Sequence, residues 1–226
     1  MIKLILFDID GTLIRSVGAG SMAFGRAFDT LFNLPDAAQG LDFAGRTDIS
    51  LLREFLGQHD IQATDSLERS FFHVYSHWLA QLLPQVEGCV LPGAHHLLTA
   101  LQSMEDSPCI GLLTGNTRLG AEIKLRHFGL WKGFQLGSFG DEDPCRNVLA
   151  RLAAQRGKDL LGSSLPHEEV LVIGDTPLDV ACAQSIGAKC LAVATGNSKL
   201  EGLEQAGATH AVASLEDIDP DTLLGL

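Results

Sequence analysis

No run of apolar residues in this chain of 226 approaches the length of a membrane span, although hydrophobic residues make up 46% of it. The apolar run from Lys3 to Phe7 is too short for the core of a signal peptide. The five cysteines are scattered, odd in number and without a Cys-x-x-Cys pair, which disfavours a disulfide framework and indicates a reduced compartment. We therefore expect a cytoplasmic protein with a sizeable core and no membrane partner.

Positive charge is also scarce, because 16 Lys and Arg residues face 28 Asp and Glu residues, a net charge of -12. Such a surface repels nucleic acids and anionic membranes, so neither is an expected partner. It also repels anionic small molecules, so a site for one would need a metal ion or local basic side chains. Nothing in the sequence indicates an oligomeric state.

The apolar pattern changes twice along the chain. The stretch from Lys3 to Phe7 predicts a buried strand, and the stretch from Gly20 to Leu83 shows helical periods with no convincing strand. From Pro92 onward helices and strands alternate, which predicts a mostly parallel sheet covered on both faces. We therefore predict an α/β fold, a doubly wound Rossmann-like core of residues 1–15 and 88–226, with an α-helical cap of residues 16–87 inserted into it.

Residues typical of helix and strand ends set the expected boundaries. In the inserted region, one helix is expected to begin at Thr64 or Asp65 as its N-cap. Another is expected to begin at Thr47 or Asp48 and to stop at Gly57. In the core, Asp143 is expected to cap a helix with Pro144 at its first position. The other expected core helices are 92–104, 117–128, 177–186 and 199–206, and the expected strands are 109–113, 134–136, 170–173 and 190–194.

Three polar clusters follow predicted strands directly. They are Asp8-Ile9-Asp10-Gly11-Thr12, Thr114-Gly115-Asn116, and Gly174-Asp175 with Asp179. Arg146 lies just inside another helix. Because ligands bind beyond the carboxyl ends of strands in an open parallel sheet, these groups are expected to converge.

The convergence has a chemical meaning. Asp8, Asp10 and Asp175 are hard oxygen donors suited to Mg²⁺, and an aspartate can also attack phosphorus. Thr114 and Gly115 leave room for phosphate oxygens, and Arg146 supplies a fixed charged fork for a transferring phosphoryl group. An isolated Asp-x-Asp is common by chance in so acidic a chain, but the order of all the clusters is not.

With these motifs the chain resembles the haloacid dehalogenase superfamily, and most closely its helical-cap branch, similar to phosphoglycolate phosphatases. The resemblance covers nearly the whole chain. It implies hydrolysis of a small phosphorylated metabolite, with Asp8 as nucleophile and Asp10 as general acid and base. It also implies Mg²⁺ held by Asp8, the Asp10 backbone carbonyl and Asp175, with Asp179 in support. Gly11, Thr12, Gly115 and Asn116 are expected at the substrate.

Two positions need separate treatment. The family usually carries lysine where Arg146 stands, so Lys132 and Lys158 are alternatives for that role. The loop Gly45-Arg46-Thr47-Asp48 resembles the cap loop that reads the substrate, so Arg46 is expected to contact a second anionic group. A solvated surface arginine is the alternative.

Other functions stay open at this point. A dehalogenase would leave Asp10 idle, and a phosphonate hydrolase or sugar-phosphate mutase of this type would use a cap lysine. No lysine occurs between Lys3 and Lys124, which disfavours both of the latter. A nucleotide or sugar-phosphate phosphatase, and an inactive binding protein on the same fold, remain as alternatives.

Overall fold

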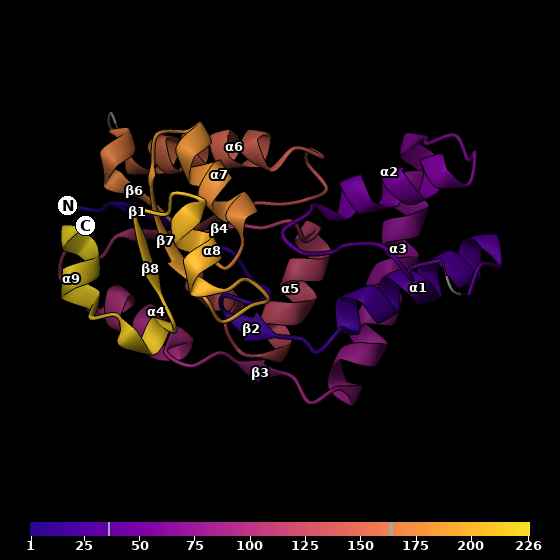
Figure 1. Ribbon diagram of the computed structural model, residues 1–226, viewed down its shortest axis with the longest axis horizontal. Coiled ribbons are helices and arrows are strands. Elements are labelled where there is room, and N and C mark those ends of the chain that lie inside the picture. The colour runs from indigo at the N-terminus through magenta and orange to yellow at the C-terminus, as the bar shows by residue number, and fades with distance from the viewer. Residues whose placement is uncertain (36, 163–164) are drawn as a thin grey trace.

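The computed structural model describes residues 1–35, 37–162 and 165–226. Its centre is a six-stranded sheet in the order β5-β4-β1-β6-β7-β8, in which all neighbouring strands run parallel (Figure 1). The strands are β1 Leu4–Phe7, β4 Cys109–Leu113, β5 Leu136–Ser138, β6 Val170–Gly174, β7 Lys189–Val193 and β8 His210–Val212. The predicted α/β class with a parallel sheet is confirmed.

Helices cover both faces of this sheet. The side chains of β1 alternate, so that Ile5 and Phe7 join one core cluster while Leu4 and Leu6 join the other, and all four are fully buried. Burial on both faces explains why the strand is apolar at every position. The first face is covered by α4 Ala94–Ser103, α5 Arg118–His127 and α9 Pro220–Gly225, and the second by α6 Arg146–Leu161, α7 Pro177–Ser185 and α8 Leu200–Gln205.

Three further helices lie to one side of the sheet, and we call residues 16–87 the inserted helices (Figure 1). They are α1 Ala19–Phe32, α2 Asp48–Gln58 and α3 Asp65–Leu82, the last followed by a short 3₁₀ turn, Leu83–Gln85. They share a core rich in aromatic rings, in which the stacked Phe28 and Phe55 lie 3.7 Å apart between centroids. Helix α5 lies between the sheet and these helices, since its Ile123 packs against their core.

The chain leaves the sheet for the inserted helices and returns from them through two short strands that lie side by side. There β2 Ile14–Arg15 pairs with β3 Cys89–Val90 in an antiparallel ribbon. These two-residue strands were not predicted, because two residues are too few to show a period. Strand β8 and helix α9 were not predicted either. No helix among the described residues has the length and apolar character needed to cross a membrane.

Most predicted helix ends agree with the structure. The hydroxyl of Thr47 accepts from the Ser50 N–H, and that of Thr64 accepts from the Leu67 N–H, each at 3.2 Å. Several boundaries differ. Gly57 lies inside α2, α4 begins at Ala94 rather than at Pro92, and α6 begins at Arg146 rather than at Pro144. The Asp143 carboxylate accepts from the Cys145 N–H at 2.8 Å, which forms a separate turn before the helix. The strand expected at 134–136 is found at Leu136–Ser138.

Candidate active site

The predicted polar clusters meet at the carboxyl end of the central strand. Strand β1 has β4 and β6 as direct neighbours, so Asp8, Thr114 and Asp175 follow three adjacent strands. From β1 the chain continues to β4 and β5 on one side and then returns to β6 on the other. Such a switch point is where parallel α/β sheets form their ligand crevice.

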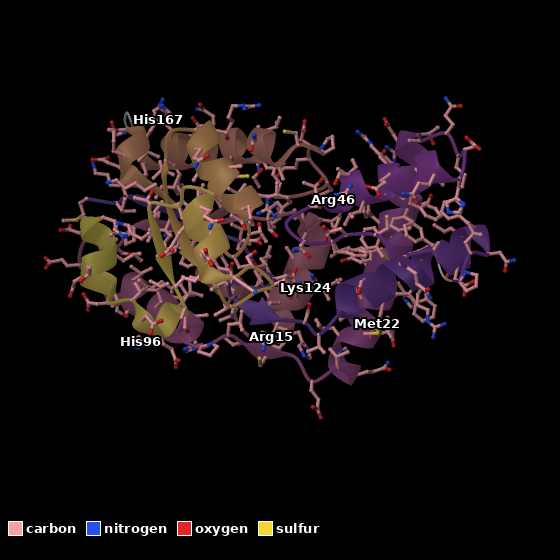
Figure 2. All side chains as sticks on the ribbon, in the orientation of Figure 1. Arg15, Met22, Arg46, His96, Lys124 and His167 are labelled. Carbon is pink, nitrogen blue, oxygen red and sulfur yellow. The ribbon has the colours of Figure 1, made fainter. Side chains whose placement is uncertain are left out.

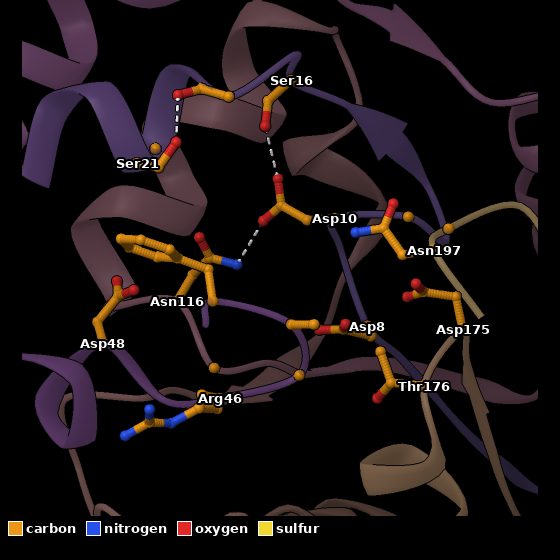
Figure 3. A pocket seen from close by; sticks show the side chains of 18 of the residues that line it. Asp8, Asp10, Ser16, Ser21, Arg46, Asp48, Asn116, Asp175, Thr176 and Asn197 are labelled. Atoms are coloured by element: carbon orange, nitrogen blue, oxygen red, sulfur yellow. Dashed lines mark hydrogen bonds between the residues drawn. The ribbon is translucent and has the colours of Figure 1, made fainter. Parts of the chain in front are cut away.

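A cavity of about 480 Å³ opens over these strand ends (Figure 3). Its floor comes from the sheet and carries Asp8, Asp10 and Asp175. Its opposite wall comes from the inserted helices and includes Phe24, Tyr75 and other side chains. The cavity therefore has a core side that bears the acidic groups and another side supplied by a different part of the chain.

Three buried carboxylates, Asp8, Asp175 and Asp179, each place an oxygen within 4.8 Å of the others. Burial raises the pKa of Asp8 to about 7, with Arg146 acting against the rise and Asp179 adding to it. Burial together with the charges of Asp179 and Asp8 raises the pKa of Asp175 to about 8. Crowded carboxylates of this kind suit a divalent cation that offsets their repulsion, so the donor set fits Mg²⁺.

The carboxylate of Asp179 already has several partners. It accepts a hydrogen bond from Arg146 through one oxygen, and from the Thr176 N–H at 3.0 Å and the Thr176 hydroxyl at 2.7 Å through the other. This arrangement places Asp179 beside the acidic pair and lets it hold Arg146 in position. Carboxylate oxygens of Asp8 and Asp175 would bind the metal, and Asp179 would support the site from beside them.

Arg146 is buried, with 7% of its surface exposed, and its guanidinium lies 3.6 Å from Asp8. It also donates to the Gly45 carbonyl at 3.0 Å. Burial works against its charge, yet Asp179 and Asp8 raise the pKa of Arg146 above its usual range. Lys132 and Lys158 are exposed, so among the three proposed basic residues Arg146 is the one at the acidic centre.

Asp10 lies on the other side of the cavity floor, and donors reach both of its oxygens (Figure 3). Ser16 donates to one oxygen at 2.8 Å, and the Asn116 amide donates to the other at 2.9 Å. Lys124 donates to that second oxygen at 2.6 Å. Burial alone would raise the pKa of Asp10, but Lys124, Asn116 and Ser16 together lower it.

Lys124 is a site residue that the sequence motifs did not reveal. It lies in α5, where Ala121 and Leu125 form the buried face, and it is itself only 4% exposed. A lysine on the apolar side of a helix is the one signal the sequence offered. Because burying an unpaired ammonium is costly, such a lysine indicates a nearby carboxylate.

The remaining predicted residues lie around this centre in supporting positions. The Thr12 hydroxyl donates to Asp175 at 3.2 Å, and the Asn116 amide donates to the buried Thr114 hydroxyl at 2.9 Å. Gly11 has φ +85°, and a Cβ there would clash with the Asp175 carboxylate. Gly11, Gly115 and Asn116 line the cavity, whereas Thr12 and Thr114 lie behind its surface.

The loop Gly45–Asp48, which we call the docking loop, sits directly on the core. The Asp48 N–H donates to the Gly115 carbonyl at 2.7 Å, and the Thr117 N–H donates to the Asp48 carboxylate at 2.7 Å. Burial raises the pKa of Asp48 to about 7, with Lys124 acting against the rise. The Arg46 side chain extends away from Asp8 and Asp175 and pairs with Glu54 at 2.6 Å (Figure 3).

Comparison with known proteins agrees with this arrangement. The model of the haloacid dehalogenase-like hydrolase family matches residues 2–187. The chain belongs to this family. As a haloacid dehalogenase-like hydrolase it is 30% identical to phosphoglycolate phosphatase of Rhodobacter capsulatus, over 96% of this chain and 97% of the relative. It is 27% identical to the phosphoglycolate phosphatase of Rhodospirillum rubrum, over 96% and 88%.

Solved structures show the same fold for this hydrolase. CbbY from Rhodobacter sphaeroides, in complex with phosphate, superposes with a TM-score of 0.76 at 19% identity, over 100% of both chains. A hydrolase from Pseudomonas syringae superposes with a TM-score of 0.71 at 24% identity, over 96% and 95%. The predicted family, its likeness to phosphoglycolate phosphatases and the predicted enzyme class, a phosphatase, are confirmed.

Proposed function

We propose that the protein is a magnesium-dependent phosphatase that hydrolyses a small phosphomonoester through an aspartyl-phosphate on Asp8. One observation carries the proposal, which is the convergence of Asp8, Asp10, Asp175 and Arg146 on the floor of a single cavity. A buried carboxylate beside a fixed guanidinium can attack phosphorus while the guanidinium holds the phosphoryl oxygens. The family membership supports phosphatase activity, and the cluster of Asp8, Asp175 and Asp179 supports a bound metal ion.

The proposed reaction has two steps. A carboxylate oxygen of Asp8 attacks phosphorus, the bond from phosphorus to the ester oxygen breaks, and Asp10 gives a proton to that leaving oxygen. Asp10 must take up this proton beforehand, because Lys124 and Asn116 lower its pKa and favour the carboxylate. Asp10, now a carboxylate, then takes a proton from water as the water oxygen attacks the phosphorus of the aspartyl-phosphate. The bond to Asp8 breaks, phosphate leaves, and Asp10 is protonated again. One residue thus serves as acid and then as base.

The other residues stabilise charge and position. Asp8 and Asp175, with the Asp10 backbone carbonyl, would hold Mg²⁺, which when bound neutralises substrate charge and polarises the phosphoryl group. Arg146 is held by Asp179 and the Gly45 carbonyl, so it is oriented before substrate arrives. Such preorganised charge is a large source of transition-state stabilisation.

Phosphoglycolate is the first substrate to test, because the two relatives described above are named phosphoglycolate phosphatases. A cavity of about 480 Å³ also leaves nucleotide and sugar phosphates open. We further propose that residues 16–87 act as a cap that encloses the leaving group. A cytoplasmic location, and the absence of nucleic-acid and membrane partners, stay predictions based on the net charge of -12 and the scattered cysteines.

The test combines a metabolite panel with one substitution. We expect phosphate release from the wild-type protein to need Mg²⁺ and to stop on addition of a chelator. Asp8→Asn should abolish turnover, because an amide does not attack phosphorus. A folded Asp8→Asn protein that keeps near wild-type activity would show that the mechanism is wrong. A wild-type protein that releases no phosphate from any panel member would favour the inactive binding protein instead.

A further inference from the structure

Lys124 is a buried cation that the proposed mechanism does not use. It projects from α5 into the region between the sheet and the inserted helices (Figure 2). Its ammonium donates to the Asp10 carboxylate at 2.6 Å and to the Asn116 side-chain carbonyl at 2.6 Å. The side chain is 5% exposed, so these contacts replace most of its water.

The three side chains form a closed set of contacts. Lys124 donates to Asp10 and to Asn116, while the Asn116 amide donates to the same oxygen of Asp10 at 2.9 Å. Ser16 holds the other oxygen of Asp10 at 2.8 Å. The donors come from α5, from the turn after β4 and from the segment before α1, so the Asp10 carboxylate is fixed from separate directions.

The surroundings of Lys124 include the inserted helices. A Cβ added to Gly20 in α1 would lie 3.4 Å from the Lys124 nitrogen and 3.8 Å from the hydroxyl of Tyr75 in α3. A Cβ there would make only ordinary van der Waals contacts, so the ammonium and the Tyr75 hydroxyl lie close to α1. Lys124 therefore reaches Asp10 from a place bounded by the sheet, α5 and the inserted helices.

We propose that Lys124 is a positioning residue for Asp10. Its ammonium fixes the orientation of the carboxylate that gives a proton to the leaving oxygen and then takes one from the attacking water, and it acts through Asp10 rather than on the substrate. The inference rests on the proposed function, in which Asp10 is the general acid and base. It assigns a role to a residue outside all the motifs that the sequence displays.

A double-mutant cycle tests this role. Lys124→Met keeps the apolar stem and removes the ammonium, and Asp10→Asn removes the proton-transfer group. We expect Lys124→Met to lower kcat for an alkyl phosphate by about 10- to 100-fold, the effect of losing a charged hydrogen bond. The loss should be smaller for p-nitrophenyl phosphate, whose leaving group needs little protonation. KM should change little.

The decisive measurement is Lys124→Met in the Asp10→Asn background. If Lys124 acts through Asp10, the second substitution should change kcat by less than about twofold. An equal loss in both backgrounds would overturn the proposal and indicate a structural role. A rise in KM with unchanged kcat would also overturn it and make Lys124 a substrate ligand.

Matched variants control for folding. Arg126→Met removes an exposed cation from the same helix and should leave kcat unchanged for both substrates. If Lys124→Met does not fold, Lys124→Gln keeps one amide donor and should show the same preference for the activated leaving group with a smaller loss. Failure of the proposed function looks different, because the wild-type protein would then be inactive or Asp8→Asn would be active.

Discussion

The basic residues that line the cavity differ in whether an acidic side chain pairs with them. Arg46 is paired with Glu54, Lys124 with Asp10, and Arg146 with Asp179. The guanidinium of Arg15 donates to the Thr195 carbonyl at 3.0 Å, and no carboxylate within the described ranges lies within 4 Å of it. Among these lining cations, Arg15 is the one whose charge is not balanced by an acidic partner.

This difference changes the expectation for substrate selectivity, which the sequence had placed at Arg46. A second anionic group on a substrate can bind Arg15 directly, whereas Arg46 would first have to give up Glu54. We expect Arg15→Ala to lower kcat/KM for small phosphorylated acids by about 10- to 100-fold, the range of a charged hydrogen bond. Arg46→Ala should lower it less. Steady-state kinetics on phosphoglycolate would measure both effects.

Activity toward p-nitrophenyl phosphate serves as the control, since this substrate has no second anionic group. Both variants should retain most of it. If Arg46→Ala has the larger effect on phosphoglycolate, the role returns to Arg46. If neither variant discriminates between the two substrates, both arginines are surface residues, and selectivity arises elsewhere in the cavity.

The residues that hold Asp10 show how far the sequence alone can lead. Asp8, Asp10 and Asp175 could be found because each follows a strand, and strand ends meet at one edge of a parallel sheet. Lys124 could not be found in this way, because it approaches from the side of a helix. Its position depends on how α5 packs between the sheet and the inserted helices, which no local pattern records.

At the scale of elements, the docking loop joins the inserted helices to the core mainly through backbone groups. In addition to the Asp48 N–H, the Ile49 N–H donates to the Gly140 carbonyl at 3.3 Å. The Thr47 hydroxyl donates to the Pro144 carbonyl at 3.0 Å. Gly115 lies directly beneath the loop, where a Cβ would clash with the Arg46 carbonyl oxygen.

Substitution of Gly115 therefore tests whether docking of this loop matters for catalysis. We expect Gly115→Ala to displace the loop and to lower kcat/KM by about 100-fold, because small misplacements at an active site have large effects. Gly202→Ala in α8 is the control, since a Cβ there meets nothing within 4 Å. It should leave activity unchanged. Wild-type kinetics in Gly115→Ala would show that the docked arrangement is not needed.

Secondary structure followed from the sequence where a helix is long and periodic or a strand is a continuous apolar run. The aromatic and aliphatic stripe of α3 and the apolar runs of β1, β4 and β6 gave their elements directly. The start of α6 was placed two residues early, because Pro144 favours a first helical position but here belongs to the turn that Asp143 forms. Proline is favoured both at the first position of a helix and in turns, so local sequence preferences alone did not distinguish the two for Pro144.

At the scale of the whole molecule, the acidic centre links folding to pH and metal. Asp8 and Asp175 have pKa values of about 7 and about 8 in the folded chain, above the usual value of 3.8. Between about pH 4 and about pH 8 the unfolded chain has released protons that the folded, metal-free chain keeps. The folded state then binds more protons, so its stability falls as pH rises through this window.

Magnesium should reverse this trend, since it binds the deprotonated carboxylates. We expect the increase in Tm on adding excess Mg²⁺ to be larger at about pH 8 than at about pH 5. Thermal unfolding with Mg²⁺ or with a chelator at each pH measures it. Asp175→Asn should remove most of the increase. An equal increase at both pH values would contradict a site built on these carboxylates.

The ribbon of β2 and β3 has a consequence for how such a protein can diversify. Ile14 pairs with Val90 and Arg15 with Cys89, so the two ends of the intervening segment lie side by side. A segment with adjacent ends can be lengthened, shortened or exchanged by recombination without moving the strands that carry Asp8 and Asp175. New substrates can then be acquired by changing one contiguous stretch of gene, provided that Ser16, which donates to Asp10, and the docking loop, whose Gly45 carbonyl accepts from Arg146, are kept.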